Sequence, residues 1–245
     1  MPLTLVALHG NGGGAFRFAR VEPFVPLDVR FRPVTLPGFA SVPRDPTLTS
    51  LRAYAERLRE CLRAEPRPRV LLGHGIGGSI ALEAAQFASN EMDGLILHAP
   101  VGARLGPRLL PRLMALPGAG RIGPWVFSSR PLRPFWRRRL FSRAVPRDYL
   151  ERFFAEYRAC SVFSQMFGLI TPAWFASLRA VSVRAALLWG ERERVLMVDQ
   201  LDAFRPLLPG CLVSLPGGWD HFPMIEDPEA YAREISALAR KLAVR

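Results

Sequence analysis

The amino-acid sequence predicts an α/β fold built on a mostly parallel, doubly wound sheet, with a helical cap inserted before the last strands. Short buried-strand patterns alternate with helical patterns in the first half and again near the end, and this alternation is typical of a parallel sheet covered on both faces. Between them, residues 101–170 lack a strand pattern and are rich in proline, arginine and aromatic residues. We therefore expect a core formed by residues 1–100 and 171–245, and a cap formed by residues 101–170.

Each element of the expected core has its own signal. Apolar runs bounded by glycine or proline predict buried strands at residues 3–10, 29–39, 69–74, 94–100, 184–192 and 211–218. Apolar residues recur with a period near 3.6 in helices expected at residues 49–65, 78–89 and 228–242. In the expected cap, prolines divide the chain into short helices. Because ligands of open α/β sheets bind at the carboxyl ends of the strands, the cap is expected to cover that edge.

Composition narrows the possible functions. The chain has 245 residues, of which 49% are hydrophobic and 22% charged, as expected for a globular protein. Its net charge is +12, and Lys241 is the one lysine, so arginine supplies nearly all of the positive charge. Arginine forms bidentate contacts with carboxylates and phosphates, so cap arginines holding an acidic ligand are one alternative. The arginines and aromatics around Trp136 fit an amphipathic cap helix better than a nucleic-acid surface, and we expect no nucleic-acid partner.

Several other classes of protein are disfavoured. No apolar run is long enough to span a membrane, and the N-terminus is too short for a signal peptide, so we expect a cytoplasmic protein without a membrane partner. Cys61, Cys160 and Cys211 are far apart and form no CxxC pair, which indicates free thiols. No clustered ligand set predicts a metal, and no dinucleotide or Walker motif predicts a cofactor. The sequence does not indicate the oligomeric state.

Four motifs follow predicted strands, where a binding site is expected. They are LHGNGGG, GHGIGG, LLWGERERVL and GGWDHFPMIEDPE, in that order along the chain. Their order and spacing resemble the α/β-hydrolase family over essentially the whole chain, in particular its ester and carbon–carbon bond hydrolases with a helical cap. In that family the strand–turn–helix motif is an elbow that carries the catalytic nucleophile. Here Gly75 occupies the nucleophile position, and Ser79, one helical turn further on, is not expected to replace it.

The resemblance implies roles for other residues. His221 would be the catalytic base and Glu193 the acid that orients it, with Glu191 as a nearby alternative. Backbone N–H groups from the loop at Gly10 and Asn11, together with that of Ile76, would form the oxyanion hole. His98 ends the strand after the elbow, so it is a further candidate for binding, and His74 beside the elbow is another.

The missing nucleophile leaves three explanations open. The chain is an inactivated or altered serine hydrolase, an enzyme without a covalent step, or a binding protein that kept the pocket. In the second, His221 would activate a water beside Gly75 or remove a proton from the substrate. Retention of the histidine, the acid and the glycine-rich loop favours the first two explanations. In each case the expected partner is a small molecule under the cap, and covalent catalysis is not expected because losing a triad nucleophile costs on the order of 10⁶ in rate.

Overall fold

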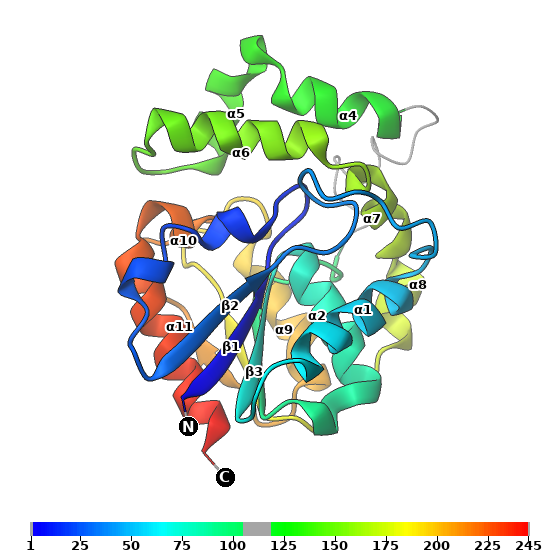
Figure 1. The fold of residues 1–245 in the computed structure, drawn as a ribbon, viewed down its shortest axis with the longest axis vertical. Coiled ribbons are helices and arrows are strands. Elements are labelled where there is room, and N and C mark those ends of the chain that lie inside the picture. The colour runs from blue at the N-terminus through cyan, green and yellow to red at the C-terminus, as the bar shows by residue number, and fades with distance from the viewer. Residues whose placement is uncertain (1, 105–118, 245) are drawn as a thin grey trace.

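The centre of the protein is a six-stranded sheet in which all neighbouring strands are parallel (Figure 1). The computed structural model describes residues 2–104 and 119–244. The strands are β1 (Leu3–Leu8), β2 (Val29–Val34), β3 (Arg69–His74), β4 (Gly94–His98), β5 (Ala185–Leu188) and β6 (Leu212–Ser214). Their order across the sheet is β2-β1-β3-β4-β5-β6. The predicted fold class is thereby confirmed, and each predicted strand segment contains a strand.

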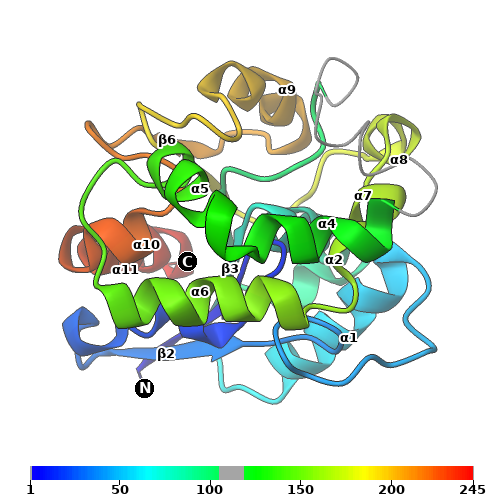
Figure 2. The ribbon, with the colours of Figure 1, turned by 90° about the horizontal axis from the view of Figure 1, so that it is seen from above.

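Helices cover both faces of this sheet. α1 (Leu51–Arg63) and α2 (Ile76–Ala88) lie on one face and α11 (Pro228–Ala243) on the other, as two perpendicular views show (Figures 1 and 2). Side chains fix where the first and last of these helices begin. Ser50 Oγ accepts a hydrogen bond from the Ala53 N–H at the start of α1, and Asp227 caps α11 in the same way, with Pro228 in its first turn.

The middle of the chain is helical in its described part. It contains α4 (Ala119–Ser128), α5 (Arg133–Leu140), α6 (Arg147–Ala159), α7 (Phe163–Leu169) and α8 (Pro172–Ser177). α4, α5 and α6 form a layer above the end of the sheet where the strands finish (Figure 1). Residues 105–118, which belong to the expected cap, lie outside the described residues. Shorter elements complete the chain: α9 (Leu201–Phe204), α10 (Pro223–Glu226), η1 (Ala15–Phe18), η2 (Glu22–Phe24), η3 (Ser89–Glu91), η4 (Arg130–Leu132), η5 (Val198–Gln200) and η6 (Arg205–Leu207).

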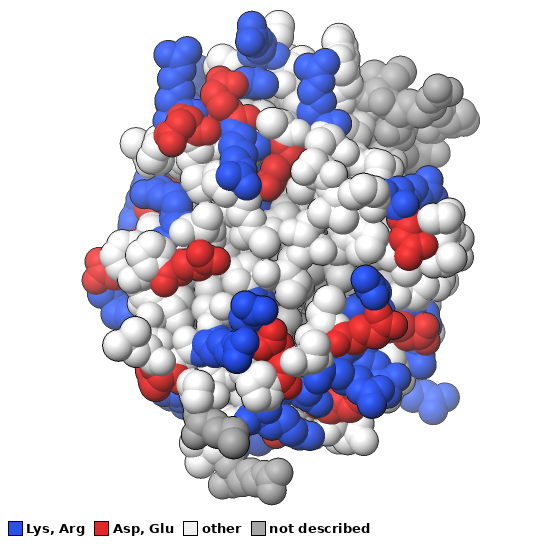
Figure 3. Space-filling model, viewed as in Figure 1, with Lys and Arg blue, Asp and Glu red and all other residues white. Residues whose placement is uncertain are grey.

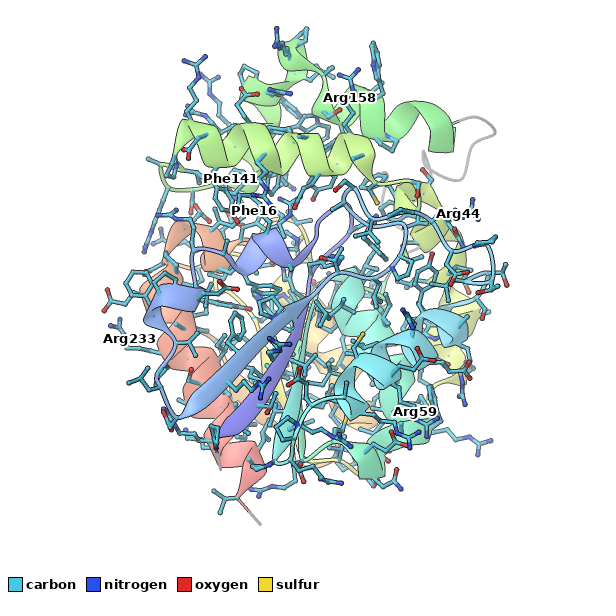
Figure 4. The ribbon with its side chains drawn as sticks, viewed as in Figure 1. Phe16, Arg44, Arg59, Phe141, Arg158 and Arg233 are labelled. Atoms are coloured by element: carbon cyan, nitrogen blue, oxygen red, sulfur yellow. The ribbon has the colours of Figure 1, made fainter. Side chains whose placement is uncertain are left out.

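An aromatic layer joins α6 to the core. Phe16, labelled in Figure 4 below α6, stacks on Tyr149 with ring centroids 4.4 Å apart. Phe141, in the same layer, contacts the rings of Phe153 and Phe222 at 5.2 and 5.4 Å. Burying large rings on both sides of a contact stabilises the contact strongly, because aromatic side chains remove much apolar area from water. The position of α6 over the core is therefore fixed by packing.

The surface shows how the excess of arginine is accommodated. On the face seen in Figure 3, arginines and acidic side chains are interspersed rather than separated by sign. Many are paired, as in the exposed contacts of Arg240 with Asp28 and of Arg52 with Glu56. No helix among the described residues has the length and apolar character needed to cross a membrane. The three cysteines are free thiols.

Candidate active site

The turn between β3 and α2 has the sharp backbone expected of an elbow. Gly75 lies there with φ 55° and ψ −120°, a conformation that residues with a Cβ adopt only under strain. The surrounding backbone is close, since a Cβ added at Gly77 would lie 2.3 Å from the carbonyl oxygen of His9. At Gly75, by contrast, the nearest described atom to an added Cβ would be the Cα of Gly10, at 3.6 Å. Position 75 therefore has room for the side chain that it lacks.

The glycine-rich loop after β1 lies against this elbow. Asn11 is held there by two hydrogen bonds: its Nδ2 donates to the Phe163 carbonyl at 3.0 Å, and its Oδ1 accepts from the Gly12 N–H at 3.0 Å. The backbone N–H groups of Asn11 and Ile76 make no hydrogen bond to any described residue. Both residues line the same cavity, and so does Gly10. Two unpaired backbone donors on one cavity are what an oxyanion site requires.

His221 and Glu193 meet although they follow different strands. His221 Nδ1 and Glu193 Oε2 are 2.8 Å apart, and the Glu193 side chain is fully buried. Its other oxygen accepts hydrogen bonds from the N–H groups of Val195 and Leu196 at 2.7 and 2.9 Å. Although burial opposes ionisation, the charge and hydrogen bond of His221 keep the pKa of Glu193 below its ordinary value. Glu191, the alternative acid, is exposed.

The carboxylate of Glu193 thus fixes the histidine. With Nδ1 engaged, the second ring nitrogen of His221, Nε2, has no hydrogen-bond partner among the described residues. The residue itself lines the cavity. A neutral imidazole held in this way carries its proton on Nδ1 and can accept another at Nε2. This is the arrangement of a general base.

The other three histidines are buried, and two of them, His74 and His98, lie next to this pair. His74 Nε2 lies 3.0 Å from the His221 carbonyl, and its ring lies 4.6 Å from the rings of both His221 and His98. Burial lowers the pKa of His74 well below its ordinary value, lowers that of His98 to about 3 and lowers that of His9 to about 4. His74 lines the cavity, but His98, which we expected there, does not. It lies behind His74, whose ring contacts those of both His98 and His221, and its Nδ1 is 3.1 Å from the Tyr231 hydroxyl.

A cavity of about 430 Å³ connects these groups with the cap. On the core side it is lined by residues predicted for the site: Gly10, Asn11, Gly75, Ile76 and His221. On the cap side it is lined by aromatic residues: Phe127, Trp136, Tyr157, Phe163 and Phe167. Arg139, a cap arginine, also reaches the lining, with its Nη2 2.6 Å from the Arg194 carbonyl. The volume and largely apolar wall suit a small organic molecule.

Sequence reasoning missed two buried charges near the site. Asp220, just before the base, accepts hydrogen bonds from the N–H groups of His221 and Arg194 at 2.8 and 3.1 Å and also binds the Arg194 guanidinium. It thereby ties the loop of the base to the loop of the acid. Arg17 lines the cavity and is buried against Glu156 of α6. The sequence holds a signal for the burial of Glu156, because it falls on the helix face that carries Phe153 and the other buried aromatics.

Taken together, these groups place a histidine–carboxylate pair and two unpaired backbone N–H groups around a cavity, with no side chain at position 75. Among the described residues no group of three or more histidine, cysteine, aspartate or glutamate side chains is placed to hold a metal ion. Ser79, the nearest hydroxyl along the chain, is fully buried and donates to the Val101 carbonyl at 2.6 Å. A histidine–carboxylate pair and two N–H donors can perform general-base chemistry with stabilisation of an oxyanion.

The parallel sheet, elbow and histidine–acid pair define an α/β-hydrolase architecture. Residues 5–234 match the model of the alpha/beta hydrolase family, and the chain belongs to this family.

Known proteins similar to the chain carry the names of lipases and esterases. The human monoacylglycerol lipase ABHD6 is 21% identical over 248 residues, which cover 95% of this chain and 74% of that protein. The crystal structure of the esterase RhEst1 from Rhodococcus sp. ECU1013 superposes with a TM-score of 0.77 at 19% identity, covering 98% of this chain and 91% of that one. A bacterial membrane phospholipase A superposes with a TM-score of 0.76 at 26% identity, covering 98% and 79%. The chain is thus similar to several lipases and esterases within the alpha/beta hydrolase family.

Proposed function

We propose that this chain hydrolyses a small acyl compound without a covalent intermediate, using His221 as a general base toward a water beside Gly75. The observation that supports the proposal most strongly is the buried Glu193–His221 pair, whose free nitrogen belongs to a cavity-lining ring. An inert pocket has no need of a buried carboxylate that holds an imidazole in one tautomer. The esterase- and lipase-like lineage favours an ester or a related acyl compound as substrate.

The proposed reaction needs only groups already described. As the water oxygen attacks the carbonyl carbon, His221 Nε2 takes a proton from the water. The carbonyl oxygen gains negative charge and is held by the N–H groups of Asn11 and Ile76. The protonated His221 then gives its proton to the departing alkoxide as the carbon–oxygen bond breaks. An acid and an alcohol leave, and the imidazole returns to its neutral form.

The space beside Gly75 can accommodate the water that this reaction requires. A serine there would fill the space with its own oxygen, whereas glycine leaves open a site whose nearest described neighbour is Gly10. General-base catalysis by a positioned side chain contributes about 10²- to 10⁴-fold. The proposed activity is therefore slower than that of a serine enzyme, and its signature is dependence on His221 rather than speed.

The proposal is tested with four matched proteins: the natural chain, His221→Ala, Glu193→Gln and Gly75→Ser. Each is assayed on a series of aryl esters with acyl chains of increasing length, and each is treated with a fluorophosphonate that labels activated serines. The natural chain should hydrolyse at least one ester and lose about 100-fold or more in kcat/KM on His221→Ala. Glu193→Gln should lose less, because the imidazole is kept but no longer oriented by a charge.

The labelling arm separates the alternatives. Mass spectrometry should find the phosphonate on Gly75→Ser and not on the natural chain. Together with ester hydrolysis by the natural chain, this result would mean that a serine-hydrolase site works here with water in place of a serine. Turnover by Gly75→Ser alone would overturn the proposal and leave the natural chain as a binding protein. Turnover by the natural chain that survives His221→Ala would also overturn it. Activity limited to substrates with an acidic C–H bond would assign proton abstraction instead of hydrolysis.

A further inference from the structure

A buried arginine that the proposed reaction does not use lines the active-site cavity. Arg17 belongs to η1, just after the glycine-rich loop, and its side chain is 3% exposed. Its guanidinium is packed between aromatic rings, with the central carbon 3.6 Å from the centroid of Phe153 and 4.8 Å from that of Tyr157. The same carbon lies 6.0 Å from the ring of Phe222, which contacts His221. Arg17 is therefore close to the wall that carries the catalytic base.

The hydrogen bonding of Arg17 is incomplete. Nε lies 3.2 Å from a carboxylate oxygen of Glu156, and Nη2 donates to the Phe153 carbonyl at 3.3 Å. Nη1 is buried and has no partner among the described residues. A buried charged donor without an acceptor is costly, so such groups are retained where a ligand or a mechanism uses them. The incomplete bonding therefore marks Arg17 as a candidate ligand-binding group.

The neighbouring chain makes room for this side chain. A Cβ added at Gly13 would lie 2.4 Å from Arg17 Nε, so the loop can pass over the guanidinium only because residue 13 is glycine. Tyr157 imposes the same condition on Gly12, where φ is +74° and an added Cβ would lie 2.2 Å from the tyrosine ring. Gly12 and Gly13 thus leave the space beside this loop that Tyr157 of the cap and Arg17 occupy.

The charge of Arg17 is only weakly compensated. Glu156 is its one carboxylate contact among the described residues. Burial raises the pKa of Glu156, and the charge of Arg17 only partly opposes this. Arg17 in turn contributes to the lowered pKa values of His9 and His74, so its positive charge acts on the interior of the site. An anion entering the cavity would meet this charge in a medium of low polarity.

We propose that Arg17 binds a carboxylate carried by the substrate, so that the preferred ligand is an organic acid with an apolar body. The carboxylate forms an ion pair with the guanidinium from within the cavity that Arg17 lines. The apolar body lies against the aromatic lining of the cap, of which Phe127, Trp136 and Phe163 are members. Arginine suits this task because its planar group can bind a second carboxylate while Nε stays on Glu156. This inference rests on the cavity being the substrate site of the proposed function, and it adds the class of substrate.

The test uses binding rather than turnover. The probes are 4-phenylbutanoate and 4-phenylbutanamide, which match in shape and differ in charge, and neither is hydrolysed in the proposed reaction. Dissociation constants are measured by calorimetry and by intrinsic tryptophan fluorescence for the natural chain, Arg17→Gln, Glu156→Gln and Arg139→Gln. The natural chain should bind the acid at least about tenfold more tightly than the amide, as expected for hydrogen bonds to a charged group.

The variants should separate a binding role from a structural one. Arg17→Gln should remove the preference for the acid, by about 10- to 100-fold, while the amide binds as before. Glu156→Gln should strengthen acid binding several-fold, because the competing negative charge is gone. Arg139→Gln, with its side chain at the cap side of the cavity, is the control and should keep the preference.

Other results would overturn the inference. Equal binding of acid and amide by the natural chain would do so, as would a preference that survives in Arg17→Gln or depends on Arg139. If Arg17 only fastens η1 to α6, Arg17→Gln and Glu156→Gln should weaken both probes alike. Because no probe is turned over, a chain that prefers the acid but hydrolyses no ester would refute the proposed reaction alone. A chain that hydrolyses esters through His221 without preferring the acid would refute this inference alone.

Discussion

Adding a side chain at Gly75 should cost less stability than adding one at Gly77, although both glycines belong to the same elbow. At Gly75 the cost is backbone strain, since φ is 55° and the nearest described atom to an added Cβ is 3.6 Å away. Such strain amounts to about 1–3 kcal/mol. At Gly77 the added Cβ would lie 2.3 and 2.7 Å from the carbonyl oxygens of His9 and Leu8. These are backbone atoms of β1 and its loop, which cannot move aside without disturbing the sheet.

The measurement is thermal unfolding of Gly75→Ser and Gly77→Ala, followed by circular dichroism in one buffer. For a chain of this size each 1 kcal/mol shifts Tm by about 2–4 °C, so Gly75→Ser should fall by about 2–12 °C. Gly77→Ala should lose more, even though alanine is favoured over glycine within a helix by about 1 kcal/mol. Failure of Gly77→Ala to fold agrees with this expectation. A Gly75→Ser protein less stable than Gly77→Ala would refute the conclusion that position 75 is open.

Two further predictions concern titratable side chains buried in and around the site. Burial lowers the pKa of His74 well below its ordinary value, that of His98 to about 3 and that of His9 to about 4. Near pH 6.5 the unfolded chain therefore binds protons at these histidines, whereas the folded chain does not. The free energy of unfolding should therefore fall from pH 7 to 5.5, by up to about 1.4 kcal/mol per pH unit for each histidine. Urea titrations at several pH values should show a weaker dependence of this free energy on pH for His98→Leu than for the natural chain. A free energy that does not change with pH in the natural chain would contradict the lowered pKa values. Asp220→Ala should cost about 2 kcal/mol by unpairing two backbone N–H groups, whereas Asp202→Ala, at an exposed ion pair, should change stability by less than about 0.5 kcal/mol.

The sheet and the elbow could be predicted because their signals are local. A buried parallel strand is a continuous apolar run, and the tight contact of strand and helix demands small residues at fixed spacing. These signals give six strands and the position of Gly75. The resemblance to a family then directed attention to His221 and Glu193, which the structure places 2.8 Å apart. Neither spacing nor composition alone would have paired them across two strands.

The missed features depend on contacts between distant parts of the chain. Arg17 and Phe153 are bonded across 136 residues, and no local pattern in a single sequence reveals such a partner. His98 was expected at the cavity because its strand ends near the elbow. The register of β3 and β4 pairs it directly with His74, which lies between it and the cavity lining. Which of two adjacent histidines reaches a ligand depends on what packs between each ring and the cavity, and the end of a strand alone does not give it.

The elbow and the Glu193–His221 pair differ as evidence about function. Packing alone accounts for the elbow, because β3 and α2 need their close glycines whatever residue occupies position 75. Glu193 is different: its side chain is fully buried, and burying a carboxylate carries a desolvation penalty of several kcal/mol that its partners here must offset to keep its pKa below the ordinary value. Replacing such a pair with apolar residues of similar size is often neutral or stabilising. A pocket kept only for its shape gains nothing from Glu193 and His221, so their pairing, and not the elbow, is the better argument that this site performs proton transfer.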